Sequence, residues 1–442
     1  MNRLRFIFPF LASFALMACV HQQAGRGTGQ LVQSQQSATQ AQSDEPSSSI
    51  VSKVNMLSPD HPVINVYMEN SGSMYGYVDL KQKSMFQQSV YSFLVDVKNS
   101  GLPSSFNLYF INSKVIDKGT DIDAFINKIT ASSFSTSGGN GTRTDIAEML
   151  KDVLSRTSND TVSIFISDCI FSPGKVNSPE AYLESQKTSL RNSFSEYLDR
   201  NPQSAVSVYQ IYSPFKGKYY DFQDKPRIYE GERPYYIFVI GNTKFVLDLK
   251  LAVGFKSFIP EANNYWAIFN FPFDVLKPYL YSLQMGPKKG SFSRKSPKVM
   301  SKARNDANGD FMFTLASDMS LYEGILESDY MMDVKNYARL INKVDSKDFF
   351  MDIERDENPA SPLTLRYEIT TQQRMPVGVF SLVLLRNAPQ WAYDMTDLDD
   401  RSFNSGNERK TYGLKYIFDG ITSAFTGKCG SFYTSMNIDV EK

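Results

Sequence analysis

The sequence predicts an α/β protein with a doubly wound, mostly parallel sheet followed by a β-rich second domain. Two observations lead to this prediction. Between residues 59 and 250, short apolar runs rich in β-branched and aromatic residues alternate with amphipathic stretches of helical period. From residue 255 to 442 the alternation is lost, and strand-like runs follow one another with few helices between them.

In the first domain, expected strands alternate with stretches of helical period. The strands are expected at 63–68, 106–111, 161–166, 205–212 and 234–241. The helices are expected at 80–98, 121–129, 145–154 and 179–198. The charged stretch 214–233 is too long for an ordinary connection, which predicts an extra hairpin at the edge of the sheet.

The second domain shows the signs of an antiparallel β-structure. Residues 363–369 alternate apolar and polar side chains, as a strand with one solvent-exposed face does. Further strands are expected at 311–315, 349–353, 377–385 and 431–438, with one helix at 411–425. The pattern predicts a β-rich domain but does not identify its fold.

The N-terminus has the features of a targeting segment. Arg3 and Arg5 precede an apolar run that is shorter than the ~20 residues of a membrane-spanning helix. The run ends in Leu16-Met17-Ala18-Cys19, which resembles the lipobox of bacterial lipoproteins. This resemblance implies a signal peptide at 1–18, a lipid on Cys19 and an envelope location, with the outer membrane favoured because Val20 follows the cysteine.

Residues 19–58 are rich in Gln, Ser, Ala and Gly and contain few large apolar side chains. Such a segment buries too little surface to offset the entropy lost on ordering. We therefore expect a flexible tether between the lipid anchor and the first domain, with a reach of about 30 Å.

Composition excludes several classes of protein. Lys and Arg together number 47, as do Asp and Glu, so no global charge favours nucleic acid. The chain contains two histidines, His21 and His61, which excludes a zinc site built from several histidines. Since His21 lies in the expected tether, histidine-based catalysis would depend on His61 alone.

Three oxygen-rich clusters follow expected strands or open an expected helix. Glu69-Asn70-Ser71-Gly72-Ser73 comes directly after the first strand, and Asp168 comes two residues after the strand at 161–166. The Gly-rich segment 138–144 precedes a helix and carries Thr142 and Thr144. The carboxyl ends of neighbouring parallel strands meet at one sheet edge, where ligands bind. Carboxylates and hydroxyls are the ligands that Mg²⁺ prefers.

The order and chemistry of these clusters resemble the metal-ion-dependent adhesion site (MIDAS) of von Willebrand factor type A (vWA) domains. The resemblance implies a metal site made by Glu69, Ser71, Ser73, Thr142 and Asp168, with Thr144 as the alternative to Thr142. It implies Mg²⁺, or Mn²⁺ or Ca²⁺, and a protein partner that presents an acidic side chain to the metal. The departure is Glu69, which stands where the family has Asp.

Two other functions stay open at this stage. A vWA-like fold with a degenerate site would be a metal-free structural scaffold. A serine hydrolase could use Ser71 or Ser73, although the sequence there lacks the G-x-S-x-G pattern and its base would have to be His61. Since no general base or second metal cluster is evident, we predict binding and no enzymatic activity. Cys169 and Cys429 are expected either as buried thiols or as one disulfide.

Overall fold

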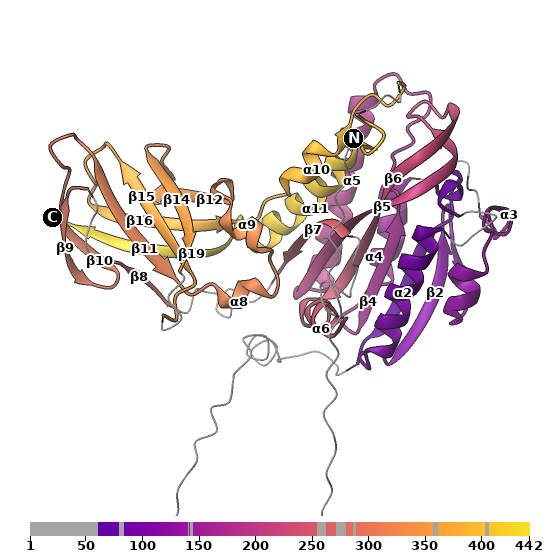
Figure 1. Cartoon of the computed structure of the whole chain (residues 1–442), viewed down its shortest axis with the longest axis horizontal. Helices are drawn as coiled ribbons and strands as arrows, with labels where there is room; N and C mark the ends of the chain where they lie inside the picture. The colour runs from indigo at the N-terminus through magenta and orange to yellow at the C-terminus, as the bar shows by residue number, and fades with distance from the viewer. Residues whose placement is uncertain are drawn as a thin grey trace, which may run out of the picture. The chain divides into compact units, whose positions relative to one another are not determined.

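The computed structural model describes residues 61–78, 84–139, 141, 145–253, 262–270, 280–285, 289–356, 361–402 and 406–442 (Figure 1). The expected signal peptide (1–18), the expected tether (19–58) and the lipidation site Cys19 lie outside these residues. The structure is of the mixed α/β class, as predicted.

Within the described residues, the first sheet has seven strands in the order β3-β2-β1-β4-β6-β5-β7. Its strands are β1 (Val63–Glu69), β2 (Ser105–Ile111), β3 (Val115–Asp117), β4 (Thr161–Ser167), β5 (Ser204–Tyr220), β6 (Pro226–Asn242) and β7 (Ala262–Phe269). All seven residues of β4 are buried, which is typical of a central strand covered on both faces.

Parallel pairing is limited to β1 with β2 and β1 with β4. All other pairs described in this sheet are antiparallel. The sheet is therefore mixed, which corrects the prediction of a mostly parallel one. The physical reason is that β5 and β6 are joined by residues 221–225 alone, and so short a connection can join only antiparallel strands.

The predicted hairpin at 214–233 is present, but as the outer half of β5 and β6. In β5 the residues up to Ile211 are all buried, whereas beyond Tyr212 buried residues alternate with more exposed ones. The change shows where the two strands leave the covered sheet and continue as a two-stranded arm (Figure 1).

Helices cover both faces of the first sheet. On one face, Val66 and Met68 of β1 belong to the same apolar core as residues of α2 (Met85–Asn99) and α6 (Thr243–Val253). On the other, Tyr67 belongs to a core with α4 (Ile146–Ser155), α5 (Pro179–Arg200) and α11 (Leu414–Cys429). The shorter helices near this sheet are η1 (Gly72–Tyr77), η2 (Asp123–Asn127) and α3 (Ala131–Ser135).

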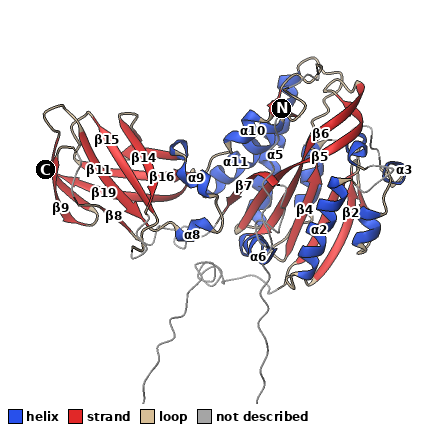
Figure 2. Ribbon diagram, viewed as in Figure 1, coloured by secondary structure: helices blue, strands red, loops and turns tan. Residues whose placement is uncertain are grey.

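The β-rich part consists of two further sheets (Figure 2). One has six strands: β9 (Ser291–Ser296), β10 (Val299–Arg304), β12 (Tyr337–Ile341), β13 (Val344–Asp345), β16 (Gly378–Leu385) and β19 (Phe432–Glu441). The other has four: β8 (Tyr281–Leu283), β11 (Phe311–Ser317), β14 (Phe349–Arg355) and β15 (Leu365–Thr371). Aromatic contacts join them, with ring centroids 5.3 Å apart for Phe313–Phe380 and 5.5 Å for Tyr337–Tyr367, as in a β-sandwich.

The predicted second domain, 255–442, does not coincide with this sandwich. Residues 262–269 form β7 of the first sheet, and α11 packs on α5. Gly420 allows this close packing, since a Cβ there would lie 2.9 Å from Leu190 Cβ. The remaining elements are α8 (Ser320–Glu323), α9 (Ser328–Met332), η3 (Val334–Asn336), α10 (Gln390–Asp394), β17 (Thr396–Asp397) and β18 (Thr411–Tyr412).

Candidate metal and ligand site at the carboxyl edge of the first sheet

Two buried carboxylates lie at the ends of neighbouring parallel strands. Glu69 is the last residue of β1, and Asp168 follows the last residue of β4. The strands pair in parallel with Met68 opposite Ile166, which confirms the prediction that they are neighbours. Both side chains are 1% exposed. The shared register therefore brings two acids to one edge of the sheet.

The two predicted serines connect these strand ends. Ser71 Oγ and Ser73 Oγ lie 2.9 Å apart and share a hydrogen bond. The Ser73 side chain also lies close enough to Asp168 to lower the pKa of that carboxyl. On the other carboxylate, Ser167 Oγ donates to Glu69 Oε2 at 2.5 Å. The chain turns into η1 directly after Ser71, so both hydroxyls are held at the edge where the carboxylates emerge.

The Gly-rich loop reaches the same edge. The backbone N–H of Gly72 donates to Gly141 O at 2.9 Å. Asp145 caps the helix that follows, because its side chain accepts from the N–H groups of Ala147 and Glu148. Thr142 and Thr144, the two threonines predicted to serve the site, lie outside the described residues.

Sequence reasoning missed Asn112, which organises this loop together with Asn70. Asn112 follows β2 and donates from Nδ2 to Asn70 Oδ1 and to Gly138 O, both at 2.8 Å. Gly139 has a φ of +76°, and a Cβ there would meet Asn112 Oδ1 at 1.8 Å. Because Asn112 comes directly after an expected strand on the same edge, its position in the sequence was the available signal.

Burial controls the electrostatics of the site. Loss of solvent raises the pKa of Asp168 to about 6, although hydrogen bonds from Ser73 and the Ile170 N–H and the charge of Arg233 lower it. The described groups therefore neutralise this carboxylate only in part, and added positive charge nearby would stabilise its ionised form.

Arg233, a second residue that the sequence reasoning missed, is a buried cation near this edge. It is 1% exposed and donates from Nη1 to the carbonyl oxygens of Glu408 and Lys410. Its guanidinium carbon lies 4.7 Å from the centroid of the Tyr219 ring. It stands in the charged stretch 214–233, where nothing in the sequence marks it as buried.

The arm formed by β5 and β6 covers part of the site. A Cβ at Gly76 in η1 would lie 2.3 Å from the Phe215 ring, so strand and helix are in direct contact. The arm is fastened in turn by Asp400, which accepts hydrogen bonds from Tyr219 Oη and from the Phe222 N–H. Ser71 is 2% exposed, whereas Ser73 is half-buried and is the one that solvent reaches among the ligand candidates that the structure describes.

The donor types suit a hard cation. Ser71, Ser73 and Asp168 lie together at this edge, whereas Glu69 accepts a hydrogen bond from Ser167 of the neighbouring strand. In the ranges that the structure describes, no group of three or more His, Cys, Asp and Glu residues gathers for a metal. A metal held here would therefore depend on hydroxyl oxygens as well as carboxylates.

Cys169, Cys429 and His61 are the other groups that the sequence offers for chemistry. Cys169 and Cys429 are free thiols, so the disulfide alternative is not formed, and burial raises the pKa of Cys169. His61 precedes β1 and contacts Leu102 O through Nδ1 at 3.1 Å. Because β1 spans about 20 Å, His61 and Ser71 lie at opposite ends of the strand.

None of the helices in the described residues is long and apolar enough to cross a membrane. Comparisons of the chain with models of protein families, with curated proteins and with solved structures find no match.

Proposed function

We propose that the first domain is a vWA-like, doubly wound domain that binds a protein partner through a divalent-metal site. The observation that carries this proposal is the hydrogen-bonded pair Ser71–Ser73 beside Asp168, at the ends of two neighbouring parallel strands. Glu69 lies at the end of the same strand pair. An edge of this kind is where open α/β sheets bind their ligands.

Ser71, Ser73, Asp168 and Glu69 would hold the ion, with Thr142 as the expected fifth ligand. When bound, Mg²⁺ or Mn²⁺ would supply an electrophilic site for a carboxylate of the partner. The protein side chains would orient the oxygen ligands and keep water from the buried acids. Since Ser73 is the more exposed hydroxyl, the partner would approach from its side.

Metal binding to the full chain tests this proposal. Titration calorimetry with Mn²⁺ at pH 7.5 should detect one site, and Ser71→Ala or Asp168→Asn should weaken binding at least about tenfold. Ser155→Ala serves as the control, because the Ser155 hydroxyl bonds the Asp152 carbonyl on α4, away from the site. Mn²⁺ at 100 times its Kd should also raise the free energy of unfolding by about 2.7 kcal/mol.

A metal-free scaffold is the second candidate, and Arg233 favours it. This buried guanidinium already lowers the pKa of Asp168, so it provides part of the positive charge that a metal would add. The absence of heat with Mn²⁺, together with the same unfolding free energy in EDTA and in Mn²⁺, would support the scaffold. A serine hydrolase is not favoured, because His61 lies at the far end of β1 from Ser71.

We further propose that the protein is an envelope lipoprotein, most consistent with the outer membrane, anchored through Cys19. The support is the Leu16–Cys19 motif after a short apolar run and the polar segment that follows it. Cys19→Ser should release the protein from the membrane fraction or block its processing. Normal processing together with unchanged membrane retention of this variant would contradict the anchor.

A further inference from the structure

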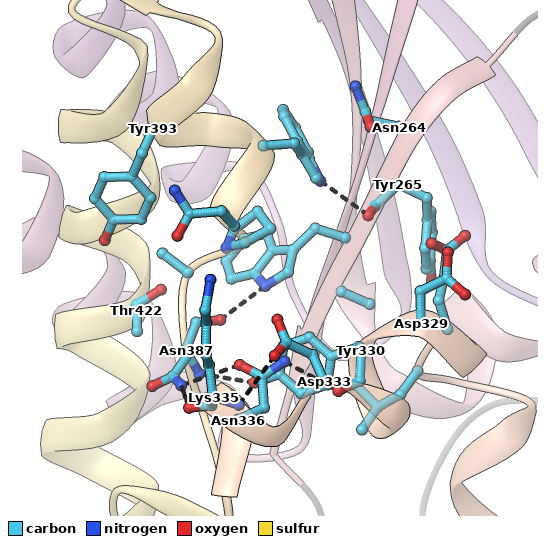
Figure 3. A pocket seen from close by; sticks show the side chains of 18 of the residues that line it. Asn264, Tyr265, Asp329, Tyr330, Asp333, Lys335, Asn336, Asn387, Tyr393 and Thr422 are labelled. Atoms are coloured by element: carbon cyan, nitrogen blue, oxygen red, sulfur yellow. Dashed lines mark hydrogen bonds between the residues drawn. The ribbon is translucent and has the colours of Figure 1, made fainter. Parts of the chain in front are cut away.

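A cavity of about 710 Å³ lies apart from the candidate metal site and shares no residue with it. Its walls come from β7, from the segment containing α9 and η3, and from the segment containing α10 with the facing side of α11 (Figure 3). Both tryptophans of the chain, Trp266 and Trp391, line it. Its volume is within the range of small-molecule sites.

Hydrogen bonds between the walls hold them in place. Trp391 Nε1 donates to Tyr265 O at 3.2 Å, and Trp266 Nε1 donates to Asn387 O at 3.0 Å. Trp391 also packs edge to face on Phe418, with ring centroids 4.9 Å apart. The indole positions are therefore fixed by the protein itself, and the cavity exists without a ligand.

Most side-chain hydrogen-bond donors around the cavity already donate to other groups of the protein. Asn264 Nδ2 donates to Gln210 Oε1 at 2.5 Å, and Asn387 Nδ2 donates to Asn336 Oδ1 at 3.1 Å. Tyr393 Oη donates to Asp419 Oδ1 at 2.6 Å. The two indole N–H groups are engaged as well, so the donors that could bind a ligand's oxygen atoms are largely used.

Acceptors remain available in the same walls. Among the residues that the structure describes, no hydrogen-bond donor reaches Asn264 Oδ1, Asn387 Oδ1 or the carboxylate of Glu327. Thr422 Oγ1 is buried and has no hydrogen-bond partner within the described part of the chain. Four acids line the cavity: Glu327, Asp329, Asp333 and Asp419.

Fewer basic than acidic side chains line this cavity. Two lysines line it, Lys187 and Lys335, and Lys187 is paired with Glu184. The side chain of Glu327 is partly buried, and this burial raises its pKa despite the nearby charge of Lys250. The cavity thus combines excess carboxylates, open carbonyl acceptors and aromatic rings.

We propose that this cavity binds an organic cation, either a free aliphatic amine or a basic side chain of a peptide. Such a ligand supplies N–H donors for the open acceptors and positive charge for the excess of carboxylates. An ammonium or guanidinium group also gains from contact with the face of an aromatic ring such as Trp391. An anionic ligand would face four carboxylates, and a neutral saccharide would find few donors for its oxygens. The proposal does not depend on the metal site.

Titration of the full chain tests this proposal, with tryptophan fluorescence and calorimetry measured together. Because both tryptophans line the cavity, their emission should change saturably with spermidine or with a Gly-Arg-Gly peptide. Binding of only one of the two identifies the source of the cation, and either supports the proposal. The apparent affinity should fall as NaCl rises, because salt screens the attraction between charges.

Two charge-removing variants and a matched control complete the test. Glu327→Gln and Asp333→Asn should each weaken cation binding about tenfold, the effect of losing one close charge contact. Glu354→Gln should leave binding unchanged, since Glu354 is an exposed residue on β14 outside the cavity. Thermal unfolding verifies that each variant is folded.

The proposal is overturned if neither cation binds at millimolar concentration in either measurement. It is also overturned if maltose or glutamate binds as well as the cations do, or if folded Glu327→Gln and Asp333→Asn variants keep the parent affinity.

Discussion

Single buried aspartates show how strongly the surroundings of a residue determine its chemistry. Asp400 is 1% exposed and holds Tyr219 and Phe222 of the β5–β6 arm. Burial raises its pKa to about 6, even though both hydrogen bonds favour the ionised form. Its neighbour Asp399 pairs with Arg401 at the surface, and this hydrogen bond lowers the pKa of Asp399.

The shift at Asp400 predicts a pH-dependent stability. Between pH about 4 and 6 the unfolded chain has released this proton and the folded chain still holds it, so stability falls as pH rises through this window. Asp400→Asn replaces this carboxyl with an amide that does not titrate, so the loss of stability with rising pH should be absent in the variant. Relative to the parent, the variant should therefore gain up to about 3 kcal/mol between pH 4 and pH 7.5 in urea unfolding.

Asp399→Asn is the matched control for this measurement. Because Asp399 is a solvent-exposed carboxylate paired with Arg401, its variant should differ from the parent by less than about 1 kcal/mol at either pH. If the difference between parent and Asp400→Asn is the same at pH 4 and pH 7.5, the attribution of this slope to Asp400 is wrong.

At the scale of elements, the arm of β5 and β6 controls how the sheet edge is presented. Its contact with η1 is tight: Phe215 occupies the space beside Gly76, and a Cβ at Gly217 would lie 2.8 Å from Gly76 Cα. Two glycines therefore let a strand pass close to the helix that carries Ser73. The arm, η1 and the ends of β1 and β4 form one packed unit.

Gly76→Ala should destabilise the fold by about 1–3 kcal/mol in urea unfolding, the usual cost of overpacking a close contact. The ideal Cβ would lie 2.3 Å from the Phe215 ring. Phe215→Ala in the same chain should recover part of that loss, since it removes the clashing ring. Gly427→Ala is the control, because a Cβ there meets no described atom within 4 Å. Strictly additive effects of the two variants would contradict this contact.

At the scale of the whole molecule, the chain returns to the first sheet between β16 and β19, the last two strands of the sandwich. Asp400 and the carbonyl groups of Glu408 and Lys410 hold the arm, and α11 covers α5. Ile417 and Ile421 belong to the same core as Leu190 and Phe194 of α5. The first sheet therefore depends on residues that lie between two strands of the sandwich in the chain.

This dependence predicts how fragments behave. A fragment of residues 59–255 lacks both β7 and α11, so it should expose apolar surface, bind the dye ANS and aggregate. A second fragment, in which residues 59–270 are joined through a flexible Gly/Ser linker to 387–430, restores these elements and should unfold cooperatively. Cooperative unfolding of the 59–255 fragment without ANS binding would contradict the dependence.

Local patterns were enough to locate most of the regular elements. The expected strand at 161–166 corresponds to β4, the expected helix at 179–198 to α5, and the charged stretch 214–233 to the arm. These features follow from short-range chemistry: apolar periodicity, caps such as Ser178 and the ordering of polar residues at strand ends. The same logic placed Glu69, Ser71, Ser73 and Asp168 at strand ends.

Only the tertiary structure decided how those elements pair. The direction of β5 and β6 follows from their continuation past residue 212, and the place of β7 and α11 follows from contacts between residues far apart in the chain. The burial of Arg233 depends in the same way on carbonyl groups more than 170 residues away. By itself, the sequence determined which segments are strands and helices and which polar residues follow them, because those properties depend on near neighbours. Strand direction, domain membership and the partner of a buried charge were decided by packing, because they depend on which distant surfaces meet.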